Sequence, residues 1–127
     1  EAQWEYAARS RGLGGIYGTD DGTIRESENY TDFRRKPHVS GIFPPNPHGL
    51  YDMSGNMSEW VNDWYDKNYY QSMPMRNPSG PNDGIKKILR GGVYGESSYA
   101  STVIKRTEFL EYSTEYSSTG FRCALNS

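Results

Sequence analysis

The chain has 127 residues, the size of a single domain, with 14 basic and 16 acidic side chains and a net charge of −2. Leucine, isoleucine, valine and phenylalanine contribute only 19 residues together, but 11 tyrosines and 3 tryptophans supply large apolar surfaces, so the composition predicts a folded domain rather than a disordered segment. The balanced charge argues against a nucleic-acid partner, and no run of about 18 apolar residues is present that would cross a bilayer.

The first half of the chain predicts one helix followed by loops. Residues 1–9 are good helix formers without glycine or proline, and they predict a helix. Residues 12–22 hold five glycines, which is typical of a loop. Residues 37–49 hold four prolines, which favour an extended segment and exclude a helix. A turn is expected at the Ser-Gly-Asn sequence of residues 54–56.

The second half predicts short strands joined by turn-rich links. Large apolar side chains alternate over residues 59–65, and residues 73–84 are rich in proline, glycine and asparagine. Further strands are expected over residues 85–93, 102–106 and 120–125. Because no internal repeat is visible, we expect an irregular α+β domain. The core is expected to contain the three tryptophans, Trp4, Trp60 and Trp64.

The most informative segment is the turn between Asp52 and Glu59. These two carboxylates stand seven residues apart and flank Gly55, whose conformational freedom permits a sharp turn. Calcium takes about six to eight oxygen ligands and often mixes carboxylates with backbone carbonyls, so this turn is a candidate calcium site. The alternative that the residues leave open is a turn in which the Asp52 side chain bonds nearby backbone groups.

Five motifs occur in an order and spacing that resemble one known family. They are Trp4–Arg9, Pro47–Trp60, Asn77–Pro81, Arg90–Gly92 and Gly120–Cys123. The series resembles the formylglycine-generating enzyme family, also called the sulfatase-modifying factor domain. The resemblance implies an α+β fold that is a C-type-lectin-like variant, low in regular secondary structure. Because such domains are usually longer, residues 1–127 are expected to form the C-terminal part of one domain whose N-terminal part is absent from this chain.

The resemblance also implies calcium sites. In the family, one calcium ion is held by residues that match Asp52, Gly55, Met57 and Glu59, the middle two through their backbone carbonyls. A second calcium uses positions that match Asn29 and Tyr30, together with two ligands in a following loop. Here that loop is short, because only seven residues separate Asn29 from Pro37, and its two ligands are not placed.

The catalytic centre that the resemblance implies is missing its key residues. The family's enzymes bind copper(I) through two cysteines that follow the Arg-Gly-Gly motif, and soft thiolates suit that ion. In this chain Glu96 stands near the first position, and Ala100 or Ser101 near the second. The single cysteine, Cys123, belongs to the closing motif and is expected to be a small buried residue. We therefore expect neither copper binding nor formylglycine generation.

Residues 94–119 are a candidate recognition surface, because aromatic residues alternate there with serine, threonine and glutamate. Tyrosine combined with serine gives adaptable contact surfaces at a low entropic cost. The residues expected to bind a ligand are Tyr94, Glu96, Ser97, Ser98, Tyr99 and Arg106. The alternative is a solvated loop that covers the core. The resemblance implies that the matching segment of the family's enzymes lines their substrate groove.

Two functions follow as hypotheses. The first is a non-catalytic, calcium-stabilised module that binds a protein or a surface ligand. The resemblance places non-enzymatic members in bacterial gliding and secretion machinery and among surface receptors, which favours an extracytoplasmic location. The second is a metal-dependent oxidase, of the formylglycine-generating or sulfoxide-synthase type, with its metal ligands outside this segment.

Overall fold

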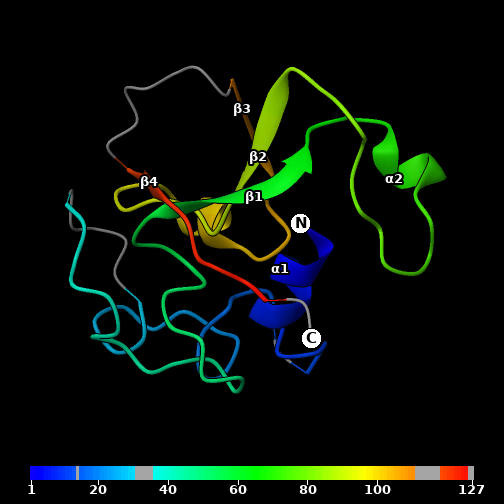
Figure 1. The fold of residues 1–127 in the computed structure, drawn as a ribbon. Coiled ribbons are helices and arrows are strands. Elements are labelled where there is room, and N and C mark those ends of the chain that lie inside the picture. The colour runs from blue at the N-terminus through cyan, green and yellow to red at the C-terminus, as the bar shows by residue number, and fades with distance from the viewer. Residues whose placement is uncertain (14, 31–35, 111–117, 126–127) are drawn as a thin grey trace.

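The computed structural model describes residues 1–13, 15–30, 36–110 and 118–125, and regular structure is sparse within them (Figure 1). The elements in chain order are α1 (Ala2–Ala8), β1 (Ser58–Trp64), α2 (Tyr69–Ser72), β2 (Lys86–Arg90), the 3-10 helix η1 (Ser98–Ser101), β3 (Thr107–Leu110) and β4 (Thr119–Gly120). This confirms the prediction of an irregular α+β domain. Among the described residues, no helix has the length and apolar character needed to cross a membrane.

The strands form one mixed sheet in the order β3-β2-β1-β4. Strand β2 pairs antiparallel with both β1 and β3, whereas the short β4 runs parallel to β1. Glu59 of β1 lies opposite Arg90 of β2, and Val61 lies opposite Ile88. Residues directly opposite each other in an antiparallel pair point to the same face, so these four side chains share one face of the sheet.

The hydrophobic core is small and lies where α1 meets the sheet. Trp4 and Ala8 of α1 pack with Met53 and Val103, and the partly buried side chains of Leu50 and Val61 pack against this cluster. Of the three tryptophans expected in the core, only Trp4 lies in this cluster. Trp60 and Trp64 are only half-buried, and the Lys87 ammonium lies 3.7 Å from the centre of the Trp64 ring.

The predicted N-terminal helix is confirmed, and its C-terminal end is capped from a distant loop. The Asn46 amide nitrogen donates to the carbonyls of Ala7 and Ala8 at 3.0 and 3.4 Å. Its amide oxygen accepts hydrogen bonds from the backbone nitrogens of His48 and Leu50 at 2.9 and 3.0 Å. Asn46 is buried, and it satisfies helix carbonyls that would otherwise lack partners. The proline-rich segment is thereby fixed against α1.

The segment of alternating apolar side chains over residues 59–65 lies in strand β1, which begins and ends one residue earlier, but the strand predicted over 102–106 is wrong. Strand β3 begins only at Thr107. The reason is that the Arg90 guanidinium binds the carbonyls of Val103 and Lys105 at 2.6 and 3.0 Å, which removes those acceptors from a strand ladder. The strand predicted over 85–93 ends at Arg90, since Gly91 and Gly92 adopt φ of +92° and +74°.

The closing strand predicted over residues 120–125 is also wrong in extent. Only Thr119 and Gly120 pair with β1, and the rest of the segment is held by the Arg122 side chain rather than by a ladder. Cys123, expected to be buried, is exposed here. Within the Gly-Phe-Arg-Cys motif, Gly120 therefore belongs to β4, and the Arg122 side chain anchors the residues that follow it.

Candidate functional site: a cation turn and an exposed recognition surface

The turn over residues 52–59 has a backbone that few sequences could adopt. Asp52, Gly55 and Asn56 have positive φ angles of 54°, 86° and 64°. A Cβ atom added to Gly55 would lie 2.6 Å from Cε2 of the Tyr30 ring, so a residue with a side chain does not fit there. Glycine is therefore required both by the backbone conformation and by the ring packed against it.

Hydrogen bonds connect this turn to the neighbouring segments. The Gly55 backbone nitrogen donates to the Gly91 carbonyl at 2.7 Å, and the Tyr94 nitrogen donates to the Asn56 carbonyl at 3.0 Å. The Ser54 hydroxyl donates to the Ser101 carbonyl at 2.7 Å. The turn and the segment that carries the candidate recognition residues are consequently held in one rigid unit.

The Asp52 side chain binds residues 40 and 41, which belong to the proline-rich segment. Its Oδ2 atom accepts hydrogen bonds from the Ser40 hydroxyl at 2.6 Å and from the Gly41 nitrogen at 3.0 Å. A carboxylate that accepts such hydrogen bonds fixes a loop at modest energetic gain. The alternative raised from the sequence is that the Asp52 side chain bonds nearby backbone groups. It is partly present, because Asp52 accepts a backbone hydrogen bond, but the donor, Gly41, lies on a distant segment.

Glu59 is buried, and each of its carboxylate oxygens has a donor. The Trp4 indole nitrogen and the Arg122 Nε atom both donate to Oε2 at 2.7 Å. The Arg122 Nη2 atom donates to Oε1 and also to the Tyr51 carbonyl, the latter at 3.0 Å. The arrangement is a two-pronged guanidinium–carboxylate pair, which is the strongest form of this contact.

The residues of the turn fit a calcium ion in type, with one conflict. Asp52, Met57 and Glu59 line the same cavity of about 470 Å³. The conflict is Arg122, which lines that cavity and already occupies the Glu59 carboxylate. The turn offers only two carboxylates, and in the described part of the chain, this turn included, no group of three or more histidine, cysteine, aspartate or glutamate side chains is arranged to hold a metal.

Asn29 and Tyr30, the candidates for a second calcium, support loops in this structure. The Asn29 amide nitrogen donates to Asp20 Oδ1 at 2.7 Å, and its oxygen accepts from the Arg25 backbone nitrogen at 2.7 Å. The Tyr30 hydroxyl shares a hydrogen bond of 2.8 Å with the Ser101 hydroxyl. Residues 31–35, in which further ligands would fall, lie outside the described residues.

The candidate recognition residues form one exposed turn, except for two of them. Glu96, Ser97 and Ser98 are exposed, and Tyr99 keeps 63% of its surface accessible, whereas Tyr94 is half-buried. The end of the turn is closed by the Thr102 hydroxyl, which donates to the Tyr99 carbonyl at 2.9 Å. The Lys105 ammonium lies 5.7 Å from the centre of the Tyr99 ring. The part of the surface over residues 111–117 lies outside the described residues.

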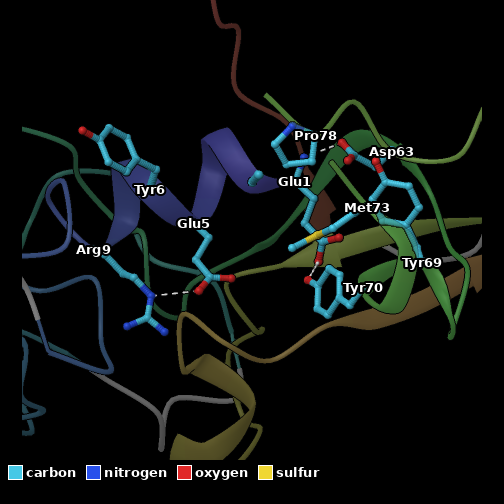
Figure 2. Close-up of a pocket in the computed structure, with 10 residues that line it drawn as sticks. Glu1, Glu5, Tyr6, Arg9, Asp63, Tyr69, Tyr70, Met73 and Pro78 are labelled. Carbon is cyan, nitrogen blue, oxygen red and sulfur yellow. Dashed lines mark hydrogen bonds and ion pairs between the residues drawn. The ribbon is translucent and has the colours of Figure 1, made fainter. Parts of the chain in front are cut away.

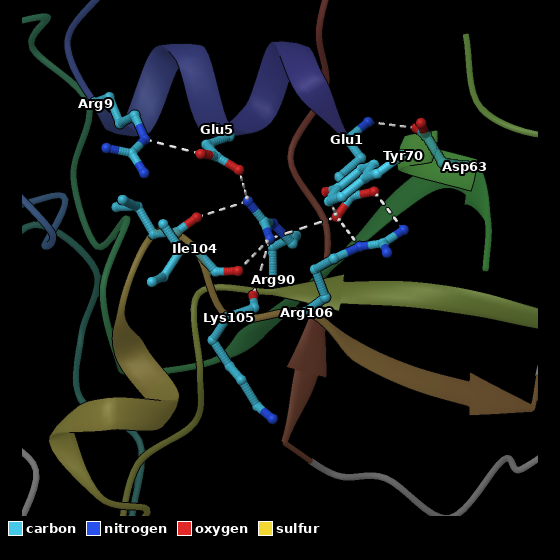
Figure 3. Close-up of polar contacts among 10 residues, drawn as sticks. Glu1, Glu5, Arg9, Asp63, Tyr70, Arg90, Ile104, Lys105 and Arg106 are labelled. Carbon is cyan, nitrogen blue, oxygen red and sulfur yellow. Dashed lines mark hydrogen bonds and ion pairs between the residues drawn. The ribbon is translucent and has the colours of Figure 1, made fainter. Parts of the chain in front are cut away.

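Arg106 lies apart from this surface, beside the beginning of α1 (Figure 3). Its Nε and Nη2 atoms donate to the two carboxylate oxygens of Glu1 at 2.6 and 2.9 Å. Its guanidinium lies 4.3 Å from the centre of the Tyr70 ring and 5.2 Å from that of Tyr65. Burial, together with the Glu1 charge, raises the pKa of Tyr70 to about 12. Arg106 is thus a structural residue in this arrangement.

A second cavity, of about 380 Å³, lies along α1 next to this cluster (Figure 2). Tyr6 and Arg9 stand at one end, and Tyr69 and Met73 at the other. The Glu5 carboxylate within it binds the Arg9 guanidinium at 2.8 Å. The charged groups here already bind one another, so the cavity holds no unsatisfied cluster that would select a ligand.

Sequence reasoning missed the residue that joins these parts, Arg90. Its side chain is fully buried, donates to the Glu5 carboxylate at 2.6 Å, and lies 5.1 Å from the Trp4 ring. The available signal was its place in the Arg-Gly-Gly motif, directly before two glycines. Only the fold shows that its partners are backbone carbonyls of residues 103–105.

The positions where the resemblance puts copper-binding cysteines have other roles. Glu96 is exposed, and Ser101 is fully buried with its hydroxyl on Tyr30. Neither residue supplies a soft ligand for copper(I). Cys123, the one cysteine of the chain, belongs to the C-terminal segment that Arg122 holds against Glu59.

The fold and the turn define a mostly irregular α+β domain of the C-type-lectin-like type. Residues 1–127 match the family described as "Sulfatase-modifying factor enzyme 1-like domain", and the chain belongs to this family. The structure resembles Treponema denticola variable protein 1, with a TM-score of 0.77 and 32% identity over 94% of this chain and 44% of that one. It also resembles PvdO from Pseudomonas aeruginosa, with a TM-score of 0.66, 26% identity, and coverage of 86% and 44%.

Two curated relatives match nearly the whole chain. The formylglycine-generating enzyme of Streptomyces coelicolor is 34% identical over 98% of this chain and 45% of its own length. The serine/threonine-protein kinase pkn1 of Chlamydia pneumoniae is 34% identical over 99% of this chain and 20% of its own length. The chain therefore spans less than half the length of each of these relatives.

Proposed function

We propose that this domain is a non-catalytic member of the family that binds a protein partner through the exposed turn of residues 96–99. The observation that carries the proposal is the replacement of the copper-binding cysteine pair by Glu96 and by Ala100 or Ser101. The scaffold around these positions is retained, since all five motifs are present. A retained scaffold without its metal ligands favours binding over oxidation.

The geometry of the turn supports this proposal. Tyr99 presents a large amphipathic side chain, and the neighbouring serines add donors and acceptors. The backbone beneath it is fixed by Ser101, by Thr102 and by the Arg90 contacts. A rigid base lowers the entropy that is lost on binding. The proposal extends to an assembly at the bacterial cell surface.

The test is a capture experiment with the full-length native protein, comparing the wild type with two variants. Tyr99→Ala is expected to lose a partner that the wild type captures in stoichiometric amount. Met75→Ala, which alters a side chain that is 100% exposed elsewhere, is the matched control and is expected to keep that partner. A partner that both variants retain contradicts the assignment of the binding surface.

Calcium is the second part of the proposal. The ion would be held by the carboxylates of Asp52 and Glu59 and the carbonyls of Gly55 and Met57, and it would neutralise the charge of the turn. A ligand that binds only the folded state raises the melting temperature, so added calcium should stabilise chelator-treated protein. Glu59→Gln should abolish the response and Asp83→Asn, at an exposed site, should keep it. Identical melting curves with and without calcium would remove the ion from the proposal.

The alternative function is a metal-dependent oxidase whose ligands lie outside this segment. The observation that favours it is the match to a formylglycine-generating enzyme that is longer than this chain. Metal analysis of the full-length protein separates the two functions. Stoichiometric iron or copper would contradict the non-catalytic proposal, and calcium alone would support it.

A further inference from the structure

The charge of Glu59 is already balanced within the chain, and this affects the calcium part of the proposed function. The Glu59 side chain is 10% exposed and that of Arg122 is 32% exposed, so the pair is largely withdrawn from water. The guanidinium contacts both carboxylate oxygens and the carbonyl of Tyr51, the residue directly before the turn. Carboxylate and backbone carbonyl are also the two kinds of oxygen that calcium prefers.

We infer that Arg122 is the resident cation of this turn and that calcium binds at Glu59 only in exchange for it. The inference rests on the proposed calcium site. The Arg122 and Trp4 donors already use three of the about four lone-pair sites of the Glu59 carboxylate, so a calcium ion that binds beside them has little of the carboxylate left. Calcium and guanidinium are both positive, and at neighbouring positions in a partly buried cleft they repel each other strongly.

The exchange has a structural consequence for the C-terminal segment. Between residues 121 and 125, Arg122 provides the side-chain hydrogen bonds to Glu59 and Tyr51, whereas Phe121 and Leu125 are 75% and 97% exposed. Tyr51 and Phe121 line the cavity that leads to the carboxylates. Displacing Arg122 would therefore detach this segment from β1 and open the cleft.

The experiment is a calcium titration by calorimetry of the wild type and three variants. Arg122→Gln removes the guanidinium and is expected to bind calcium about tenfold more tightly than the wild type, because one close positive charge is lost. Glu59→Gln is expected not to bind. Arg76→Gln makes the same charge change at an exposed position and is expected to match the wild type, which separates a local effect from net charge.

The outcomes separate this inference from the proposal on which it rests. Equal affinity in the wild type and Arg122→Gln would mean that calcium binds beside Arg122, which overturns the exchange and keeps the calcium site. No binding in either protein overturns both. A Tyr99-dependent partner remains a separate question, decided by the capture experiment alone.

A second measurement keeps the inference testable if Arg122→Gln does not fold. In the wild type, the Nε–H group of Arg122 donates to Glu59, so its nitrogen-15 NMR signal reports that contact. Calcium is expected to shift this signal towards the position of a free arginine while the signal of Arg106, paired with Glu1, stays in place. An Arg122 signal that does not move at saturating calcium would falsify the exchange.

Discussion

Two arginines that each bind several groups have very different places in this molecule. Arg90 is fully buried, and its partners, from Val103 at 13 residues to Glu1 at 89 residues, lie far away in the sequence. Arg25 is 37% exposed, and its three carboxylate partners, Asp20, Asp21 and Glu28, lie within five residues. The difference teaches that the number of ion pairs says little about stability, because burial and the span of chain that is joined decide the effect.

The largest effect is expected from Arg90→Met. This change leaves carbonyls of residues 103–105 and part of the Glu5 charge without a buried partner, so the unfolding free energy should fall by about 3–5 kcal/mol. Urea denaturation measures it. Arg25→Met is the comparison variant, and its exposed pairs predict no resolvable change in the unfolding midpoint. Similar losses in the two variants would break the comparison drawn above.

A smaller loss is expected from Asn46→Ala. The buried Asn46 amide caps α1 and closes the turn to Leu50, so its removal leaves helix carbonyls and backbone nitrogens unpaired. The expected cost is about 1–3 kcal/mol in the unfolding free energy. Denaturation in urea again provides the value. Asn82→Ala, at an exposed site, serves as the control, and an equal effect of both variants would contradict the role of the cap.

The loop around Arg25 is expected to respond to acid. Hydrogen bonds from Asn29, with the Arg25 guanidinium, lower the pKa of Asp20, and hydrogen bonds from Thr23 lower the pKa of Asp21. Because the folded-state pKa lies below the ordinary 3.8, the stability is present above pH 3.8 and is lost as the pH falls through the folded-state pKa. Between pH 5 and about 2, the melting temperature of Asp20→Asn should therefore fall less than that of the wild type. An equal fall of the melting temperature in both proteins would show that the Asp20 contacts do not contribute to the stability at this pH.

A last effect is expected at high pH and concerns the cluster beside α1. The pKa of Tyr70 is raised from 10.0 to about 12, so the native state keeps a proton that the unfolded chain releases. Stability should fall as the pH rises from 10.0 to about 12, and Tyr70→Phe should lose less over this range. Absorbance titration of the phenolates provides an independent check. Equal slopes for the two proteins would contradict the raised pKa.

Local patterns predicted the elements whose partners lie nearby. The helix at Trp4, the strand through Trp60 and the turn at Gly55 follow from periodicity and from glycine's conformational freedom, and all three are present. The pair of carboxylates that bounds the turn was also visible, and the structure places Asp52 and Glu59 on one cavity. Whether calcium binds there stays a prediction.

The sequence alone determined the family, the irregular α+β character and the presence of a single cysteine, because these depend on which residues stand in which order. Only the tertiary structure decided that Arg90 holds residues 103–105 away from a strand, that Arg106 pairs with Glu1, and that Arg122 neutralises Glu59. An arginine can reach any acceptor that the fold brings within a few ångströms. Its partner is therefore fixed by long-range packing, which periodicity and local spacing do not encode.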